Sequence, residues 1–528
     1  MSARTEGIAP NAARLLWAGF MAILAAGVGF SVRGGILGQW AEQFGFTMTE
    51  LGTITGGGLT GFGIVIIVTS LFADAIGYGK LMISAFLLHL ISAIITLAAP
   101  AAFAAGGKEA AFNCLFWGMF IFAVGNGVCE AVVNPLTATL YPNNKTHFLN
   151  ILHAGWPAGL VLGGLASTFM SATTDAAGKV TSPAVDWKIQ MSLFLIPVII
   201  YGVMLLGQKF PKSEAAKAGV GVGQMIASVA TPMFIILLVL HALVGYVELG
   251  TDSWISKITG TIMASPANGL KLFVYTSLLM FALRFVAGPI VHQISPLGLL
   301  FVSAVLGAIG LTLLGNAVGV VACVVAATVY AVGKTFLWPT MLAVASERFP
   351  KGGAVAIGLM GGVGMLSAGL LGGPIIGYKQ DYYAKKDLEA KAPETYQRYA
   401  VEQPKGVVFL PGIKGLDGAK VGILNDNGKE LDAVTAALAK DNKADANHDK
   451  LVGWWQTAKA SAEADSKPVT AATLEGGRMA LKVTAAVPVI MAVLYLGLIL
   501  YFKATGGYKA LHVSGEQIAG GVQGPGEA

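Results

Sequence analysis

The chain has 528 residues, of which 55% are hydrophobic and only 12% carry a charge. Soluble domains carry roughly 25% charged residues, so this composition excludes a water-soluble globular protein. The formal net charge of +6 is modest for this length. We interpret it as loop charge beside a membrane and expect no nucleic-acid partner.

Long apolar segments recur along almost the whole chain. A spanning helix needs roughly 20 mostly apolar residues, whereas a barrel strand would alternate over about ten. The run lengths therefore predict an all-α membrane protein with twelve transmembrane helices. The predicted spans are 15–38, 51–73, 80–104, 111–139, 149–172, 189–208, 227–254, 269–291, 296–316, 317–342, 353–377 and 479–502.

One region, 379–477, differs from the rest because it holds 14 Lys/Arg and 15 Asp/Glu residues. It predicts a polar insertion between helices 11 and 12, with short amphipathic helices at Glu430–Lys440 and Leu451–Ala462. The stretch 441–449 resembles a calcium loop only faintly, because Lys450 and Gln456 replace the required glycine and glutamate. We interpret it as a solvated polar turn and expect no metal site.

Basic residues in the short loops set the expected orientation. Arg14, Lys80, Lys209, Arg348 and Lys509 all fall on the side of the two termini, which predicts cytoplasmic termini in a cell inner membrane. The expected division is an N-terminal tail 1–13, a six-helix bundle 14–208, a cytoplasmic linker 209–226, C-terminal bundle helices 227–378, an extracytoplasmic insertion 379–477, helix 12 at 478–503 and a Gly-rich cytoplasmic tail 504–528.

The two halves of the chain repeat weakly. Glu130 lies five residues before Pro135 in helix 4, and Lys334 lies five before Pro339 in helix 10. A looser match, which needs a one-residue gap, relates Arg33 in helix 1 to Glu248 in helix 7. Internal repeats are common in transporters, so we expect two pseudo-symmetric six-helix bundles around a central cavity.

The loop after helix 2 carries Asp74, Gly77 and Lys80, and is similar to the signature of the major facilitator superfamily. Ser70 and Ala75 depart from that signature. The pattern Glu130-x-x-x-Asn134-Pro135, followed by Asn150 and His153, resembles the fucose-permease type of sugar–proton symporter. The resemblance implies alternating access, a cytoplasmic gate at the signature loop, to which we also assign Arg284, and proton coupling through Glu130.

A charged residue in a spanning helix costs free energy of insertion, so each one is a functional candidate by default. Glu130 is either the protonatable cavity group or the permanent partner of Lys334 or Arg33. Arg33 stands near the point where the resembled family has a carboxylate. It either binds an anionic group of the substrate or neutralises Glu130. The candidate binding and coupling residues are Arg33, Glu130, Asn134, Asn150, His153, Trp156, Glu248, Asp252, Trp254, Lys334 and Trp338.

No phosphate-binding loop, zinc motif or nucleophile elbow is present, so we expect neither an ATP-driven pump nor an enzyme. The favoured hypothesis is a monomeric, cofactor-free secondary transporter of a small polyhydroxy solute such as a sugar, driven by a proton or sodium gradient. One alternative is a carrier of small organic or inorganic anions, and another is a non-transporting sensor or scaffold that acts through 379–477.

Overall fold

The computed structural model describes residues 8–46, 48–56, 58–171, 173–174, 180–440, 446–511, 513 and 517–518. Within them, twelve helices are long and apolar enough to cross a membrane, which confirms the predicted span count. Most ends fall within a few residues of the predicted ones. The largest departures are at the insertion, where the helices of the eleventh and twelfth spans run well beyond 377 and begin well before 479.

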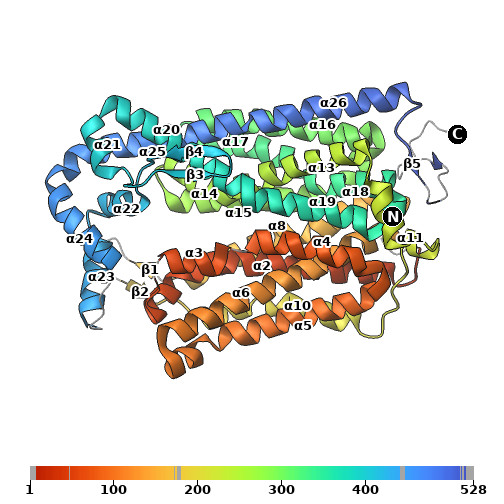
Figure 1. The fold of residues 1–528 in the computed structure, drawn as a ribbon, viewed down its shortest axis with the longest axis horizontal. Helices are drawn as coiled ribbons and strands as arrows, with labels where there is room; N and C mark the ends of the chain where they lie inside the picture. The colour runs from red at the N-terminus through yellow and green to blue at the C-terminus, as the bar shows by residue number, and fades with distance from the viewer. Residues whose placement is uncertain are drawn as a thin grey trace.

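The helices form two bundles that lie side by side (Figure 1). The first bundle contains α2 (Ala12–Phe44), α3 (Met48–Gly56), α4 (Gly58–Ile76), α5 (Tyr78–Leu97), α6 (Ala99–Leu140), α7 (Lys145–His153), α8 (Gly155–Met170), the hairpin β1 (Thr173–Thr174) and β2 (Val180–Ser182), α9 (Trp187–Ser192) and α10 (Leu195–Leu205). The linker carries α11 (Glu214–Lys217) and α12 (Val222–Val229).

The second bundle repeats this plan. It contains α13 (Pro232–Gly245), the π-helical turn η1 (Tyr246–Gly250), α14 (Thr251–Ile262), α15 (Pro266–Arg284), α16 (Ala287–Asn316), α17 (Gly319–Lys334), α18 (Leu337–Arg348), η2 (Pro350–Gly352), α19 (Gly353–Ser367), η3 (Ala368–Gly372), α20 (Gly373–Lys391), α25 (Ala462–Thr484) and α26 (Ala486–Ala504). A short hairpin, β5 (Ala510–Leu511) with β6 (Gln517–Ile518), follows α26.

Glycines bring equivalent helices into backbone contact in both bundles. A Cβ placed on Gly159 of α8 would lie 2.4 Å from the Leu24 carbonyl oxygen of α2. In the other bundle, a Cβ on Gly245 of α13 would lie 2.0 Å from the Gly364 oxygen of α19. Small residues permit such close approach where no hydrophobic effect drives helices together. The fifth helix thus packs on the first as the eleventh packs on the seventh, as the expected pseudo-symmetry requires.

The insertion is built on a continuation of the membrane helices. α20 runs outward to Lys391 and α25 returns from Ala462, so the expected boundaries at 378 and 478 fall inside helices. Between them lie α21 (Pro393–Tyr399), the hairpin β3 (Lys405–Val407) and β4 (Leu410–Ile413), α22 (Gly418–Asp426), α23 (Lys429–Lys440), α24 (Ala446–Ala458) and η4 (Lys459–Ser461). The two expected amphipathic helices correspond to α23 and α24. The expected polar turn falls largely on 441–445, outside the described residues.

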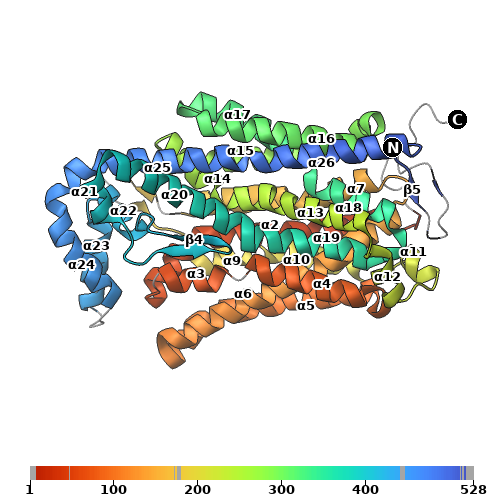
Figure 2. The same ribbon diagram turned by 45° about the horizontal axis from the view of Figure 1, so that its top comes forward.

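The insertion has its own small hydrophobic core, separate from that of the bundles. Tyr399, Trp455 and Val469 are among its buried side chains. Arg398 donates to the enclosed Asp465 carboxylate at 2.6 Å, which ties α21 to α25. The insertion lies at the end of the molecule opposite both termini (Figures 1 and 2). We call these two ends the insertion end and the termini end.

The separate core predicts that the outer part of the insertion is dispensable for folding of the bundles. Replacing 392–461 by a short linker between α20 and α25 should leave a monodisperse protein in detergent, measured by size-exclusion chromatography and thermal unfolding. The control is Gly476→Leu, which places a side chain where even a Cβ would lie 2.5 Å from the Gln380 oxygen. That variant should unfold at lower temperature. Aggregation of the deletion variant alone would contradict the prediction.

The placement of the two ends also predicts topology. A reporter fused after Gly415 should be active outside the cytoplasm, and one fused after Lys509 should be active in it, because the two sites lie at opposite ends of the bundle. Alkaline phosphatase and green fluorescent protein fusions measure this directly. Activity of both fusions on one side would contradict the arrangement.

Candidate substrate and coupling site

Two buried ion pairs occupy the middle of the second bundle. Glu248, in the π-helical turn η1, accepts from the Arg284 guanidinium of α15 at 3.0 Å. Asp252, one turn further on, is bonded to the Lys334 ammonium of α17. π-Helical turns are rare in proteins as a whole, but those that occur often lie at functional sites. Each pair is neutral, so these four central charges of the second bundle cancel one another. Lys334 therefore does not neutralise Glu130, contrary to one of the sequence alternatives.

Glu130 of α6 has a different environment. Its carboxylate accepts a hydrogen bond from the Asn134 side-chain amide at 2.6 Å, one turn along the same helix. The Asn134 oxygen in turn lies 2.8 Å from His153 Nε2 of α7. None of the ion pairs among the described residues includes Glu130, and its side chain stays partly exposed. The permanent salt bridge to Arg33 or Lys334 is absent.

His153 links this group to the second bundle. Its backbone oxygen accepts from Arg284 Nη1 at 2.5 Å, while Arg284 Nε donates to the Thr335 oxygen at 3.0 Å. Hydrogen bonds thus link Glu130 through Asn134, His153 and Arg284 to Glu248, with His153 bonded through its ring on one side and its backbone oxygen on the other. Arg284, which the sequence analysis assigned to the cytoplasmic gate, is 1% exposed and joins His153 to Glu248 in this chain instead.

Arg33 of α2 stands apart from these groups. Its guanidinium carbon lies 3.6 Å from the centre of the Phe122 ring, and its Nε and Nη2 are buried without a hydrogen-bond partner. A charge in the middle of a spanning helix costs about 2.5–3.5 kcal/mol on insertion scales. Arg33 carries this cost without neutralising Glu130, contrary to the other sequence alternative.

The three candidate tryptophans have different surroundings. Trp156 of α8 is partly exposed, and its ring centre lies 5.6 Å from that of Phe30. Trp254 donates to the Gly373 oxygen at 2.7 Å and so joins α14 to α20. Trp338 is 4% exposed and packs on His241. Trp156 is therefore the one best placed to contact a solute, whereas the other two hold helices together.

Asn150 also lies away from the hydrogen-bond chain. It is fully enclosed and donates to the Thr146 oxygen at 2.8 Å and to Thr340 of the second bundle at 3.4 Å. It belongs to the seam between α7 and α18. The sequence resemblance placed Asn150 with His153, but the two side chains point to different neighbours.

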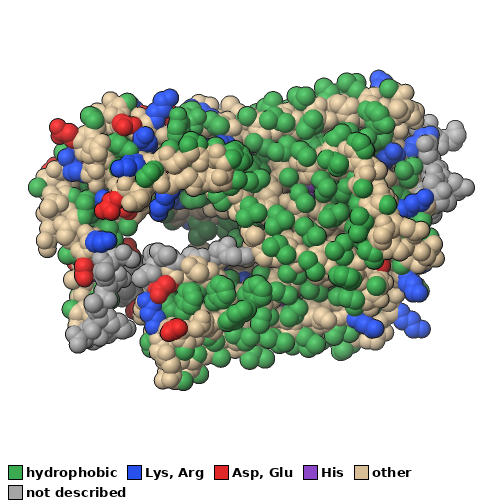
Figure 3. Space-filling view, in the orientation of Figure 1, with side chains coloured by type: hydrophobic (Ala, Val, Ile, Leu, Met, Phe, Trp, Pro, Cys, Tyr) green, Lys and Arg blue, Asp and Glu red, His purple; other side chains and the backbone are tan. Residues whose placement is uncertain are grey.

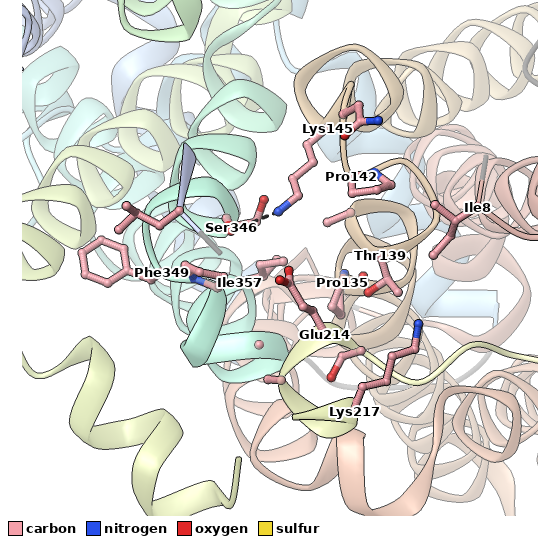
Figure 4. A pocket seen from close by; sticks show the side chains of 17 residues that line it. Ile8, Pro135, Thr139, Pro142, Lys145, Glu214, Lys217, Ser346, Phe349 and Ile357 are labelled. Atoms are coloured by element: carbon pink, nitrogen blue, oxygen red, sulfur yellow. Dashed lines mark hydrogen bonds between the residues drawn. The ribbon is translucent and has the colours of Figure 1, made fainter. Parts of the chain in front are cut away.

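Further contacts close the seam towards the termini end. Lys145 donates to the Ser346 oxygen at 3.3 Å (Figure 4), and the Gly288 amide donates to His147 Nδ1 at 3.2 Å. The pocket in Figure 4, about 250 Å³ in volume, lies beside the Lys145–Ser346 bond and is lined from both bundles and from the linker residues Glu214 and Lys217. It is too close to the gate to be the central cavity.

The signature loop contributes to the same closure. The Asp74 carboxylate lies where α19 begins, since a Cβ on Gly353 would be 3.0 Å from its Oδ2. A carboxylate at a helix N-terminus is stabilised by the helix dipole. Gly77, at φ 93°, makes the turn into α5, and Lys80 is exposed. At the insertion end, the space-filling view shows a hollow between the insertion and the first bundle (Figure 3).

The chain after α26 folds back onto the closed end. The Tyr508 hydroxyl donates to the buried Glu347 carboxylate at 2.7 Å, and Arg348 donates to the Lys509 oxygen at 2.6 Å. The Val513 amide reaches Glu214 of the linker at 3.3 Å. The tail therefore fastens the end of α18 to the linker while the seam is closed.

These contacts predict that the tail stabilises the closed termini end. A hydrogen bond to a charged group is worth about 1.5–3 kcal/mol, so Tyr508→Phe should shift the population towards opening roughly tenfold or more. Faster maleimide labelling of a cysteine placed at Thr139, which lines the pocket of Figure 4, measures the shift. Tyr501→Phe, at an exposed position of α26, is the control. Unchanged labelling in a folded Tyr508→Phe protein would contradict this role.

Known proteins share this architecture. The family model described as Major Facilitator Superfamily matches residues 19–373. No curated protein sequence matches the chain. Among solved structures, the Escherichia coli fucose:proton symporter FucP matches at a TM-score of 0.56 and 16% identity, over 70% of this chain and 92% of that one. Another structure of FucP matches equally and is described as being in the outward conformation.

Two further structures match over most of their length. The human organic anion transporter MFSD10 has a TM-score of 0.55 at 11% identity, over 92% of this chain and 100% of that one. A bacterial homologue of the human lysosomal transporter Spinster, inward-facing and unoccupied, has a TM-score of 0.55 at 14% identity, over 92% and 96%. At these identities the likeness establishes the fold alone.

Proposed function

The chain belongs to the major facilitator superfamily, and we propose that it is a proton-coupled secondary transporter of a small polyhydroxy solute, working by alternating access in the cell inner membrane. The observation that carries the proposal is the hydrogen-bond chain from Glu130 to Glu248. It joins a carboxylate without a cationic partner to the central contact between the bundles. We further propose that both termini are cytoplasmic, so that the hollow at the insertion end faces outward.

Protonation of Glu130 would act through this chain. As an anion, its carboxylate holds the Asn134 amide, whose oxygen holds the His153 ring. A charge-assisted hydrogen bond is roughly twice as strong as a neutral one, so a proton on Glu130 weakens the first link. His153 then loses its anchor, and its backbone bond to Arg284 is free to shift. Proton binding from the open side would thereby loosen the seam that must part for release on the other side.

A polyhydroxy solute is favoured by the partly exposed aromatic pair Phe30 and Trp156, since sugars present apolar C–H faces to aromatic rings. The fold likeness to a fucose:proton symporter is compatible with this choice. The second candidate, a carrier of small anions, is favoured by the unpaired guanidinium of Arg33. The fold likeness to an organic anion transporter is equally compatible with it.

Replacing Glu130 with Gln separates coupling from binding. The variant keeps a partner for Asn134 and leaves no buried cation unpaired, so it should fold with nearly unchanged thermal stability. In proteoliposomes it should lose uphill uptake driven by a pH gradient but retain exchange of substrate down its own gradient. Glu109→Gln, at an exposed site of α6 just after its kink at Gly106 and Gly107, should behave as wild type.

Glu248→Gln provides a contrast. It leaves Arg284 buried without its carboxylate, and breaking such a pair typically costs about 3–5 kcal/mol, so that protein should unfold at lower temperature and lose both activities. Uphill uptake at the wild-type rate in a folded Glu130→Gln protein would reject Glu130 as the coupling group.

A further inference from the structure

Arg33 is an exception among the buried cations of this protein. Four Lys and Arg side chains are buried in the described part of the chain: Arg33, Lys145, Arg284 and Lys334. Arg284 and Lys334 hold carboxylates, and Lys145 holds the Ser346 oxygen. The Arg33 guanidinium donates to no described group, although it is 95% enclosed.

The acidic groups of the first bundle do not neutralise Arg33. Glu50 is paired with Lys108 and Asp186 with Lys188, while Glu42 and Glu109 are exposed. Glu130 is held by Asn134, and Asp74 lies at the N-terminus of α19, where its oxygens accept no hydrogen bond from a described group. No carboxylate among the described residues forms an ion pair with Arg33. An anion from outside the chain is therefore the natural counter-charge.

The unused donors have the geometry of a carboxylate site. Nε–H and Nη2–H point the same way and form the side-on fork of a guanidinium, and both lack partners here. Such a fork matches the two oxygens of a carboxylate. Phe122 covers the face of the guanidinium at 3.6 Å, which holds the plane in place while leaving the in-plane N–H groups free.

Open space and an exposed aromatic side chain lie close to Arg33 along α2. A Cβ on Gly34, the next residue, would meet nothing within 4 Å. Phe30, one turn earlier on the same face as Gly34, is 48% exposed and lies against Trp156. A ligand that reached Arg33 along this face would pass an aromatic pair before it met the cation.

We propose that the transported solute is a monosaccharide acid, an aldonate or uronate, whose carboxylate binds the Arg33 fork while its carbon chain or ring packs on Phe30 and Trp156. This assignment rests on the proposed function and narrows its substrate class. It also determines how much net charge one transport event moves across the membrane. One substrate anion entering with one proton on Glu130 moves no net charge, whereas a neutral sugar with one proton would move one positive charge.

The first experiment compares three probes on purified full-length protein by thermal shift. Gluconate carries both the hydroxyl groups and the carboxylate, glucose carries the hydroxyl groups alone, and acetate carries the carboxylate alone. Only gluconate should raise the melting temperature. Arg33→Gln should abolish the shift, Arg33→Lys should retain part of it because the charge remains without the fork, and the exposed Arg14→Gln should retain all of it.

The second experiment measures gluconate uptake into proteoliposomes. A pH gradient should drive uptake, and a potassium-diffusion potential of either sign should leave the initial rate unchanged. Stabilisation by glucose alone would overturn the acid-substrate assignment while leaving the Glu130 mechanism intact. Equal stabilisation by acetate and gluconate would overturn the sugar-acid class in favour of a simple anion carrier. No stabilisation by any probe, an undiminished gluconate shift in Arg33→Gln, or potential-driven gluconate uptake would each overturn the proposal.

Discussion

The cost of burying charge in a low-dielectric interior organises the centre of this protein. Each ionised group there needs a counter-charge or a set of hydrogen bonds, and its placement decides which groups are free to change state. The second bundle satisfies the requirement internally through Glu248–Arg284 and Asp252–Lys334. The first bundle does not, because Glu130 holds only an amide and Arg33 only an aromatic face. The two bundles are similar in fold but unlike in electrostatics.

Close helix packing supplies the rigidity that this arrangement needs. The glycine contacts of α2 with α8, and of α13 and η1 with α19 and η3, make each pair of helices a stiff unit. The bundles meet through similar glycine contacts of α4 with α19, where a Cβ on Gly63 would lie 2.8 Å from the Gly362 oxygen, and through hydrogen bonds of α7 to the second bundle. Because none of the ion pairs among the described residues crosses this boundary, relative movement of whole bundles is favoured over deformation within one of them.

The sequence was sufficient for the span count and the family, because these follow from run length and local motifs. It identified nearly all the central charged residues as well, since each is anomalous in an apolar helix. The sequence did not show which of these residues form ion pairs with one another. The repeat placed Glu130 opposite Lys334, but Lys334 meets Asp252, because α14 and α17 belong to the same bundle.

Arg284 shows the same limit. Its position at the end of an apolar run suggested a gate, whereas the chain breaks only briefly at Phe285–Val286 before α16 continues, so Arg284 lies deeper than the run implied. Pairing depends on which faces of distant helices meet, and one sequence carries little information about that.

None of the ion pairs among the described residues crosses from one bundle to the other. This matters for movement, because separating a buried ion pair typically costs about 3–5 kcal/mol whereas exchanging a hydrogen bond for one to water costs about 0.5–1.5 kcal/mol. With both central ion pairs inside the second bundle, the seam opens without separating an ion pair. Arg284 keeps Glu248 when its bond to His153 is lost, whereas Lys145 loses its bond to the Ser346 oxygen. The paired centre of the second bundle can therefore serve as a fixed surface, against which changes of charge on Glu130 and Arg33 decide when the first bundle moves.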